Sequence, residues 1–285
     1  MATILITGTG SGLGASLASE LANDGHTIIA TVRSLIPDNF PEIKPSSLGT
    51  IKFMQMDVTK IAEIKGVMKQ LSDSKLTIDT VILNAAHYPI GTIESANYEY
   101  IKQCFEVNYW GNINVIREVM PFLRQQRYGK IIGVSSLSSA VGLPCDGHYS
   151  ASKAAMDRML ESLRYEVSAF GIQVSSIQPA SFASNLFKSL TNEKIEDGPY
   201  SQLIEHWMRS ISNAEGENGK YLEEIHNTIR KIIANGQPEF LYTVGAKATE
   251  IAALLASMSS KEREEAILNW SDTDWWANSK IKAKL

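Results

Sequence analysis

Short apolar runs rich in Ile and Val alternate with stretches of helical periodicity through the first two-thirds of the chain. The apolar runs predict buried strands at residues 3–7, 27–32, 51–56, 80–83, 130–134 and 173–177. Helical spacing predicts helices at residues 12–23, 61–72, 98–127 (as two helices) and 149–170. Because strands and helices alternate and the strands show no polar face, they indicate an α/β fold with a Rossmann-like, doubly wound parallel sheet.

The pattern changes after Pro179. Apolar side chains at helical spacing predict two further helices, separated by a polar, glycine-containing break at residues 213–219. A last strand at 240–244 and a helix at 246–258 complete a sheet of about seven strands. We therefore interpret residues 185–238 as a helical insertion that covers a substrate site, within a single domain of residues 1–285.

The composition is that of an ordinary globular protein, with 44% hydrophobic and 20% charged residues and a net charge of −4. Without a basic excess, no nucleic-acid partner is expected. No apolar run reaches the roughly 18 residues that span a bilayer, and the N-terminus enters a strand pattern without a leader-like segment. Cys104 and Cys145 lack metal-ligand spacing, so no metal site is expected and a reducing cytoplasm is predicted.

The segment from Tyr149 to Lys153 places a phenol and an ammonium four residues apart. On a helix these positions share a face, where a lysine stabilises a tyrosinate and lowers the pKa of the phenol. Such a tyrosine can exchange a proton with a reacting oxygen. The spacing alone is weak support, because it also occurs on ordinary surface helices.

A glycine-rich loop follows the first predicted strand and opens the first helix. Glycines allow the backbone to turn tightly and to approach a pyrophosphate at the helix N-terminus. A purely structural turn is the weaker interpretation, because the position after the first strand is where a dinucleotide binds. The candidate cofactor contacts in this loop are Gly8, Ser11, Gly12, Leu13 and Gly14.

Arg33 ends the second predicted strand, where proteins that prefer NAD usually carry an acidic residue. An arginine there can hold the 2′-phosphate of NADP, and Ser11 can add a hydroxyl. The alternative is a solvated surface arginine. The sequence favours NADP(H) over NAD(H) as cofactor.

Polar residues also follow the later strands, at the edge where open α/β sheets bind ligands. Taken alone, each of these positions is more typical of turn chemistry, or in the case of Asn108 of a solvated or packed helix residue, than of a functional site. The candidates are Asp57-Val58, Asn84-Ala85, Asn108 and Ser136.

Together these residues resemble the short-chain dehydrogenase/reductase family over the first two-thirds of the chain. Its glycine pattern is matched by Thr7, Gly8, Gly12 and Gly14, and its Asn-Asn-Ala-Gly element appears as 83–86 with Ala86 in place of glycine. Its Pro-Gly-x-x-x-Thr element appears as 179–184, with Ala180 in place of glycine. The resemblance implies a catalytic set of Asn108, Ser136, Tyr149 and Lys153, and further cofactor contacts from Tyr149, Lys153, Pro179, Phe182 and Ser184.

The resemblance implies carbonyl–alcohol interconversion by hydride transfer, with Tyr149 as general acid/base and Ser136 orienting the oxygen. Lys153 is then expected to lower the pKa of Tyr149 and to hold the nicotinamide ribose, and Asn108 to fix a water that links Lys153 to solvent. The two alanines are expected to alter cofactor affinity without abolishing chemistry, since alanine disfavours positive φ. The alternatives are a non-catalytic NADP(H)-binding sensor or scaffold, and an extended epimerase/dehydratase, which the spacing of Gly12 and Gly14 disfavours.

The layout of the last third resembles the hydroxysteroid and retinol dehydrogenase branch of the family. This favours a small, lipophilic carbonyl or alcohol substrate. Phe187, Trp207 and Met208 are candidate contacts, and the alternative, at least as well supported, is that they pack the insertion against the core. The resemblance also implies a homodimer or homotetramer. The tryptophans at 270, 275 and 276 are expected to pack internally or at a subunit interface.

Overall fold

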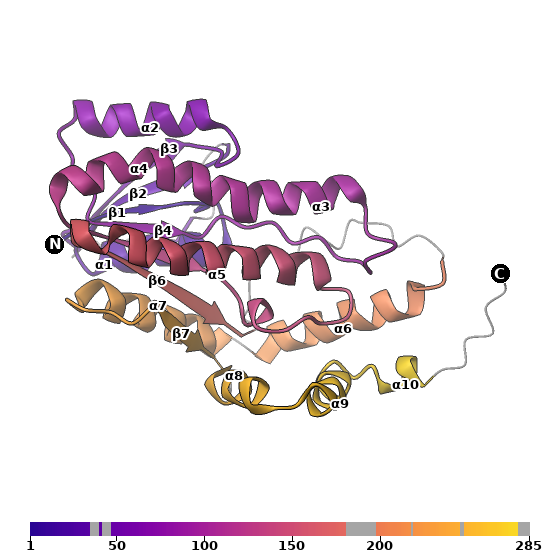
Figure 1. Cartoon of the computed structure of the whole chain (residues 1–285). Coiled ribbons are helices and arrows are strands. Elements are labelled where there is room, and N and C mark those ends of the chain that lie inside the picture. Colours follow the sequence, from indigo (N-terminus) through magenta and orange to yellow (C-terminus); the bar gives the residue numbers. More distant parts are fainter. Residues whose placement is uncertain (35–39, 42–46, 181–197, 218, 246–247, 279–285) are drawn as a thin grey trace.

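The computed structural model describes residues 1–34, 40–41, 47–180, 198–217, 219–245 and 248–278. Strands in this part of the chain form one parallel sheet in the order β3-β2-β1-β4-β5-β6-β7 (Figure 1). The strands are β1 (Thr3–Ile6), β2 (Thr27–Val32), β3 (Thr50–Gln55), β4 (Thr80–Leu83), β5 (Gly129–Val134), β6 (Ile172–Pro179) and β7 (Leu241–Val244). The predicted doubly wound fold and its seven strands are confirmed.

Helices cover both faces of the sheet, as the apolar strands require (Figure 1). Along β1 the side chain of Leu5 points to one face, and those of Ile4 and Ile6 to the other. Apolar side chains of α2 (Ile61–Asp73), α4 (Asn112–Gln126) and α5 (Gly147–Val167) pack with Leu5. Those of α1 (Gly12–Asn23) and α7 (Gly219–Ala234) pack on the opposite face.

The helical run expected at 98–127 begins as α3 (Tyr98–Phe105) and continues into α4 through a π-helical turn, Glu106–Gly111. Such turns insert an extra residue into a helix and are frequent at functional sites. The sequence predicts two helices here but gives no sign of the π turn. The turn matters because it holds Asn108.

After β6, the described chain resumes before α6 (Ser201–Glu217). The predicted break at 213–219 is wrong over most of its length, because α6 continues to Glu217 and α7 begins at Gly219; residue 218 lies outside the described residues. α7 packs on the sheet, so α6 is the described part of the insertion that approaches the site.

The chain after β7 forms α8 (Ala248–Ser257), α9 (Ser260–Trp270) and α10 (Asp274–Ala277). The predicted helix at 246–258 corresponds to α8, with 246–247 outside the described residues. The sequence analysis missed α9, although the pair Ser259 and Glu262 forms a capping box that signals a helix start. Among the described helices, none is both long and apolar enough to cross a membrane.

The strand order reverses beside β1, since the chain moves outward to β2 and β3 and then returns to β4. In open α/β sheets this reversal opens a crevice at the carboxyl ends of the strands, where ligands bind. The loops that follow β1 and β4 therefore meet at the expected binding edge.

Candidate active site

The glycine-rich loop turns sharply from β1 into α1. Gly8 has φ +70° and Gly12 has φ +57°, conformations that side chains disfavour. A Cβ on Gly14 would lie 2.3 Å from the carbonyl oxygen of Gly8, so only glycine fits there. Ser11 occupies the N-cap position of α1 without using its side chain as a cap. The loop therefore presents backbone N–H groups at a helix N-terminus, as a pyrophosphate site requires.

Asn84, after β4, fastens the glycine loop to the neighbouring strand. Its side-chain Nδ2 donates to the carbonyl oxygens of Thr7 (2.9 Å) and Gly8 (3.0 Å). The backbone N–H groups of Asn84 and Ala85 donate to the hydroxyl of Thr7, at 2.9 and 3.0 Å. The hydrogen bonds of Asn84 and Ala85 therefore hold the glycine-rich loop in shape, although this element departs from the family's Asn-Asn-Ala-Gly pattern.

The substitutions of Ala86 and Ala180 for family glycines leave no backbone strain of the left-handed kind. Neither residue has a positive φ. The Ala180 N–H donates to the carbonyl oxygen of Val244 at 2.8 Å, which continues the pairing of β6 with β7. The methyl groups of Ala86 and Ala180 therefore lie on backbone that an L-residue adopts without strain.

Arg33 follows β2, and its side chain is exposed on the binding edge. The pKa of His87, in the loop after β4, is lowered first by burial and then by the charge of Arg33. The charge of Arg33 is thus close enough to the loop after β4 to affect His87. The Asp57 side chain stabilises a local turn. One of its carboxylate oxygens accepts hydrogen bonds from the backbone N–H (2.9 Å) and the hydroxyl (2.8 Å) of Thr59. Val58 is buried after Asp57.

Asn108 is fully buried in the π-helical turn and joins three elements. Its Oδ1 accepts from the His87 N–H at 2.8 Å, and its Nδ2 donates to the His87 carbonyl oxygen at 2.9 Å. Nδ2 also lies 2.9 Å from the Ser152 hydroxyl on α5. Asn108 therefore fixes the loop after β4 against the helix that carries Tyr149 and Lys153.

Tyr149 and Lys153 lie in the first half of α5 and are both buried. The Lys153 Nζ donates to the carbonyl oxygen of Val134, at the end of β5, at 2.8 Å. It lies 5.7 Å from the centroid of the Tyr149 ring. Ser136 caps the short turn that follows β5, where its Oγ accepts from the Ser138 N–H at 3.1 Å. The structure thus brings Asn108, Ser136, Tyr149 and Lys153 to one edge of the sheet.

Burial dominates the protonation of this pair. It raises the pKa of the Tyr149 phenol well above the usual range, the negative charge of Asp146 adds to the rise, and a hydrogen bond with Ser136 opposes it. Burial also lowers the pKa of Lys153 to about 8, against the opposing effect of Asp157. The expected lowering of the Tyr149 pKa by Lys153 is therefore wrong for this arrangement. The phenol is therefore neutral at physiological pH, and it can give its proton only to a strongly basic oxygen such as a developing alkoxide.

Three polar residues near this set were missed by the sequence analysis: Tyr88, Asp146 and Asp157. Asp157 lies one turn after Lys153, and its oxygens accept from Ser176 Oγ (2.6 Å) and Gln178 Nε2 (2.8 Å). Its spacing of four from Lys153 was a readable signal. Asp146 also had a signal in the sequence, because it is a lone acid in the mostly apolar segment that precedes Tyr149. Tyr88 had no such signal.

An apolar cluster borders Tyr149 on the side of α6. The rings of Tyr88 and Tyr149 lie 4.6 Å apart, and the indole N–H of Trp207 donates to the Tyr88 hydroxyl at 3.2 Å. Trp276 packs against Tyr200 at 6.2 Å between ring centroids, so the C-terminal helices contact the same region. The other members include Ile90, Cys104, Leu143, Cys145, Leu203, Ile204 and Met208.

The remaining candidates belong to the end of β6 and the chain that follows it. Pro179 ends β6 at the binding edge. Phe182, Ser184 and Phe187 lie outside the described residues. Both cysteines, Cys104 and Cys145, are free thiols in the buried cluster.

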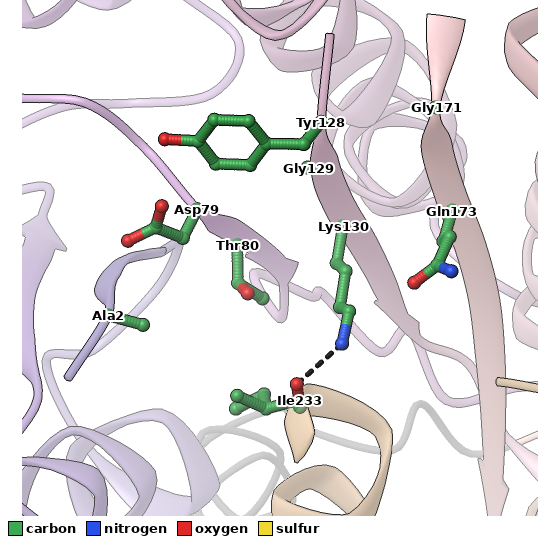
Figure 2. A pocket seen from close by; sticks show the side chains of 9 residues that line it. All are labelled: Ala2, Asp79, Thr80, Tyr128, Gly129, Lys130, Gly171, Gln173 and Ile233. Atoms are coloured by element: carbon green, nitrogen blue, oxygen red, sulfur yellow. Dashed lines mark hydrogen bonds between the residues drawn. The ribbon is translucent and has the colours of Figure 1, made fainter. Parts of the chain in front are cut away.

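A pocket of about 280 Å³ lies at the opposite, amino edge of the sheet, lined by Asp79, Tyr128 and Lys130 among others (Figure 2). The Lys130 ammonium crosses it and donates to carbonyl oxygens at the end of α7: those of Ile232 (3.0 Å), Ile233 and Asn235 (2.7 Å). A cation there neutralises the negative end of the helix dipole. The geometry is that of a structural clamp, remote from Tyr149.

Comparisons with known proteins agree with the geometry. A family model described as short chain dehydrogenase matches residues 2–195. The chain is 32% identical over 245 residues to 3-ketodihydrosphingosine reductase of Bacteroides thetaiotaomicron, which covers 85% of this chain and 87% of the relative. It is 28% identical over 226 residues to 11-beta-hydroxysteroid dehydrogenase type 2 of Homo sapiens, covering 78% of this chain and 54% of the relative.

Solved structures show the same fold. A short-chain dehydrogenase from Burkholderia cenocepacia in complex with NADP superposes with a TM-score of 0.71 and 24% identity, over 94% of this chain and 97% of that one. A short-chain dehydrogenase/reductase from Burkholderia phymatum in complex with NAD gives a TM-score of 0.75 at 19% identity, over 93% and 94%. One of these neighbours was thus solved with NADP and the other with NAD.

Proposed function

Because this chain belongs to the short-chain dehydrogenase family, we propose that it is an NADP(H)-dependent oxidoreductase that interconverts a lipophilic carbonyl compound and its alcohol. The observation that carries the proposal is the grouping of the partly buried Ser136 with the buried Tyr149 and Lys153, beside a glycine loop shaped for a dinucleotide. When bound, the nicotinamide cofactor supplies or accepts the hydride.

The residues present fit such a cofactor. The close approach of Gly14 to Gly8, which leaves no room for a Cβ, keeps the backbone of the loop free to contact a pyrophosphate. Lys153 and Tyr149 would hold the nicotinamide ribose. Pro179, Phe182 and Ser184 would contact the nicotinamide amide and pyrophosphate.

Tyr149 is the proposed proton donor. Its phenol carries its proton at neutral pH, and although burial raises its pKa, a carbonyl oxygen beside it becomes basic enough to take the proton as it gains negative charge. Ser136 orients that oxygen through its hydroxyl. Lys153, with its pKa lowered to about 8, remains mostly an ammonium at neutral pH and can resupply the proton. Asn108 acts by fixing the geometry of α5 and the loop after β4.

Arg33 supports NADP(H) as the cofactor, because no acid takes its place at the end of β2 and its charge is close enough to the loop after β4 to affect His87. In an Arg33→Gln variant, we expect the KM for NADPH to rise about 10- to 100-fold, the usual scale of a charge-assisted hydrogen bond, with little change for NADH. Equal effects on both cofactors, or a wild-type preference for NADH, would contradict the assignment.

The apolar cluster beside Tyr149 supports a lipophilic substrate, with Leu203, Ile204 and Trp207 of α6 as its proposed wall. The relatives named for ketodihydrosphingosine and hydroxysteroid point the same way. We propose α6 as the lid over the site.

The proposal is tested by measuring NADPH oxidation with a panel of long-chain ketones, steroids, retinoids and short aldehydes. The wild type should turn over a lipophilic member of the panel, and Tyr149→Phe should lose about 10²- to 10⁴-fold in kcat while it retains NADPH binding. A wild type that binds NADPH and reduces no carbonyl would replace this proposal with a cofactor-binding sensor or scaffold.

The family resemblance also supports a homo-oligomer that pairs the helices carrying Asn108 and Tyr149. Each of these segments has a large exposed side chain, Trp110 in the π-helical turn and Tyr165 on α5. Light scattering of the purified protein checks this: a dimer or tetramer is expected, and a monomer at micromolar concentration would contradict it.

A further inference from the structure

Asp157 is a buried acid on helix α5 that the mechanism above does not use. It is only 2% exposed, and it follows Lys153 by four residues and Tyr149 by eight. Residues four apart lie on the same face of a helix, so Asp157 continues the face that carries the proposed catalytic pair. Acids are almost never fully buried unless they are paired. The position of Asp157 therefore calls for a physical reason.

Neutral donors from strand β6 bind the Asp157 carboxylate. Its Oδ1 accepts from the Ser176 hydroxyl at 2.6 Å, and its Oδ2 accepts from Gln178 Nε2 at 2.8 Å. Both oxygens thus have a partner, as buried polar atoms normally do. A hydroxyl and an amide bring no positive charge, so these bonds fix the carboxylate in place and leave its charge to act on its surroundings.

The same hydrogen bonds continue to the segment that carries Ser136. Gln178 Nε2 also donates to the Ser139 hydroxyl at 2.7 Å, and the Ser139 hydroxyl donates to the carbonyl oxygen of Ser136 at 2.7 Å. Gln178 directly precedes Pro179, the last residue of β6. Asp157 therefore links α5 to the end of β6 and to the turn after β5, which are segments of the candidate site.

Lys153 is the cation on which this charge acts. Its ammonium donates to the neutral carbonyl oxygen of Val134, and no ion pair within the described residues includes it. Burial lowers its pKa to about 8, and the negative charge of Asp157 is the largest effect that opposes the fall. The thiol of Cys104 acts in the same direction only when it is ionised, and burial raises its own pKa to about 11. At neutral pH, Asp157 is therefore the acid that favours the charged lysine.

The other buried acid beside this pair, Asp146, acts elsewhere. It is 1% exposed at the N-cap position of α5, its Oδ2 accepts from the Ser150 hydroxyl at 2.9 Å, and no ion pair within the described residues includes it. Its negative charge raises the pKa of Tyr149, whereas Asp157 acts on Lys153. The two acids thus act on different members of the catalytic pair.

We propose that Asp157 is a positioning residue for the reaction: its carboxylate holds Lys153 in the ammonium form inside the fold, and its bonds to β6 hold α5 against the binding edge. The inference rests on the proposed function, in which the Lys153 ammonium holds the nicotinamide ribose and resupplies the proton of Tyr149. Asp157 lies one helical turn beyond Lys153 and acts through it. Its removal should therefore change the pH range in which the lysine works.

The test compares the pH dependence of kcat/KM for carbonyl reduction in the wild type and in Asp157→Asn. In the wild type, reduction should fall as the pH rises through about 8, because Lys153 then loses its proton. Without the carboxylate the effect of burial is less opposed, so the fall should begin about 1 pH unit lower, the usual scale for loss of a nearby opposite charge. The variant should thus lose about 5- to 10-fold in kcat/KM between about pH 8 and pH 9, and less than about 2-fold near pH 6.

Two further variants separate this role from a structural one. Asp73→Asn removes an exposed acid on α2 and should leave the pH profile unchanged. Ser176→Ala removes one bond to Asp157 but keeps its charge, so it should lower stability without moving the profile. If Asp157→Asn does not fold, Asp157→Ser takes its place, because a hydroxyl still bonds with β6 and carries no charge. A fall at the same pH in the wild type and in the uncharged variant, or an equal shift in Ser176→Ala, would overturn the inference.

A direct titration of the lysine separates this inference from the proposed function. If the wild type reduces no carbonyl, the proposed function fails. The NMR signal of the Lys153 side chain, recorded in lysine-labelled protein and assigned with Lys153→Met, then decides the inference by itself. A titration midpoint about 1 pH unit lower in the uncharged variant at position 157 than in the wild type supports it, and equal midpoints overturn it.

Discussion

Replacing Asp146 by Asn should make the ligand-free protein more stable at neutral and alkaline pH. The pKa of this acid rises from 3.8 to about 6 in the fold because burial penalises the carboxylate. A raised pKa means that the folded state binds the proton more tightly than the unfolded state does. The contribution of Asp146 to the free energy of unfolding is therefore most favourable at low pH. It declines as the pH rises through the pKa values that Asp146 has in the unfolded and the folded protein.

The size of the effect follows from the shift. A displacement of about two units at about 1.4 kcal/mol each gives an upper bound of ~3 kcal/mol above pH 7. The side chain of an Asn at this position keeps an oxygen that can accept the hydrogen bond from the Ser150 hydroxyl, but it does not ionise. The advantage of the variant over the wild type should grow by about 1 kcal/mol between about pH 5 and pH 8, because much of the penalty is already present at the lower value.

Urea unfolding of both proteins at several pH values measures this difference, with Asp73→Asn as the exposed control. The slope of free energy against urea should stay the same, so that midpoints report stability. A variant that is less stable than the wild type at pH 8, or a difference that does not change with pH, would refute the claim that Asp146 is buried as an unpaired charge.

Three further predictions concern the glycine-rich loop, the Lys130 contacts and the pH dependence of reduction. Gly14→Ala should abolish dinucleotide binding, because the new Cβ would lie 2.3 Å from the Gly8 carbonyl oxygen, whereas Gly10→Ala meets nothing within 4 Å and should bind normally; equal affinities would contradict this. Lys130→Met should lower the free energy of unfolding by about 1–3 kcal/mol through loss of the bonds to the end of α7, without changing kcat/KM, as thermal unfolding and kinetics can check. The kcat/KM for reduction should fall as pH rises through about 8, where Lys153 loses its proton, and a profile flat to higher pH would exclude that ammonium from proton supply.

The strands of the sheet were predictable because each one follows from a local pattern. Ile4, Leu5 and Ile6 are all buried, since a central parallel strand is covered on both faces, and such a strand reads as an unbroken apolar run. The glycine loop and the Tyr149–Lys153 spacing were likewise local, so their position at the carboxyl edge followed from the order of elements.

The errors came from features that depend on tertiary contacts. The break expected at 213–219 rested on polar residues and glycine, which weaken a helix by only about 1 kcal/mol per glycine. Packing of Leu203 and Trp207 elsewhere on α6 helps to offset that cost. The pKa of Tyr149 was misjudged because the spacing of Lys153 shows neither the burial of the phenol nor the charge of Asp146. The spacing of residues along the chain also does not show whether Asp146, three residues before Tyr149, has a charged partner.

The proton transfer from Tyr149 is tested most directly by a single-turnover measurement. Enzyme with bound NADPH is mixed rapidly with a carbonyl substrate, and the decay of NADPH fluorescence is followed for the wild type, Tyr149→Phe and Tyr165→Phe. Tyr165 lies on the same helix and is 69% exposed, so its loss controls for removal of a phenol hydroxyl from α5. We expect the rate to fall about 10²- to 10⁴-fold in Tyr149→Phe alone, while NADPH binding, which loses at most one ribose hydrogen bond, weakens by no more than about 10-fold. A Tyr149→Phe protein that reduces the carbonyl as fast as Tyr165→Phe would contradict the account.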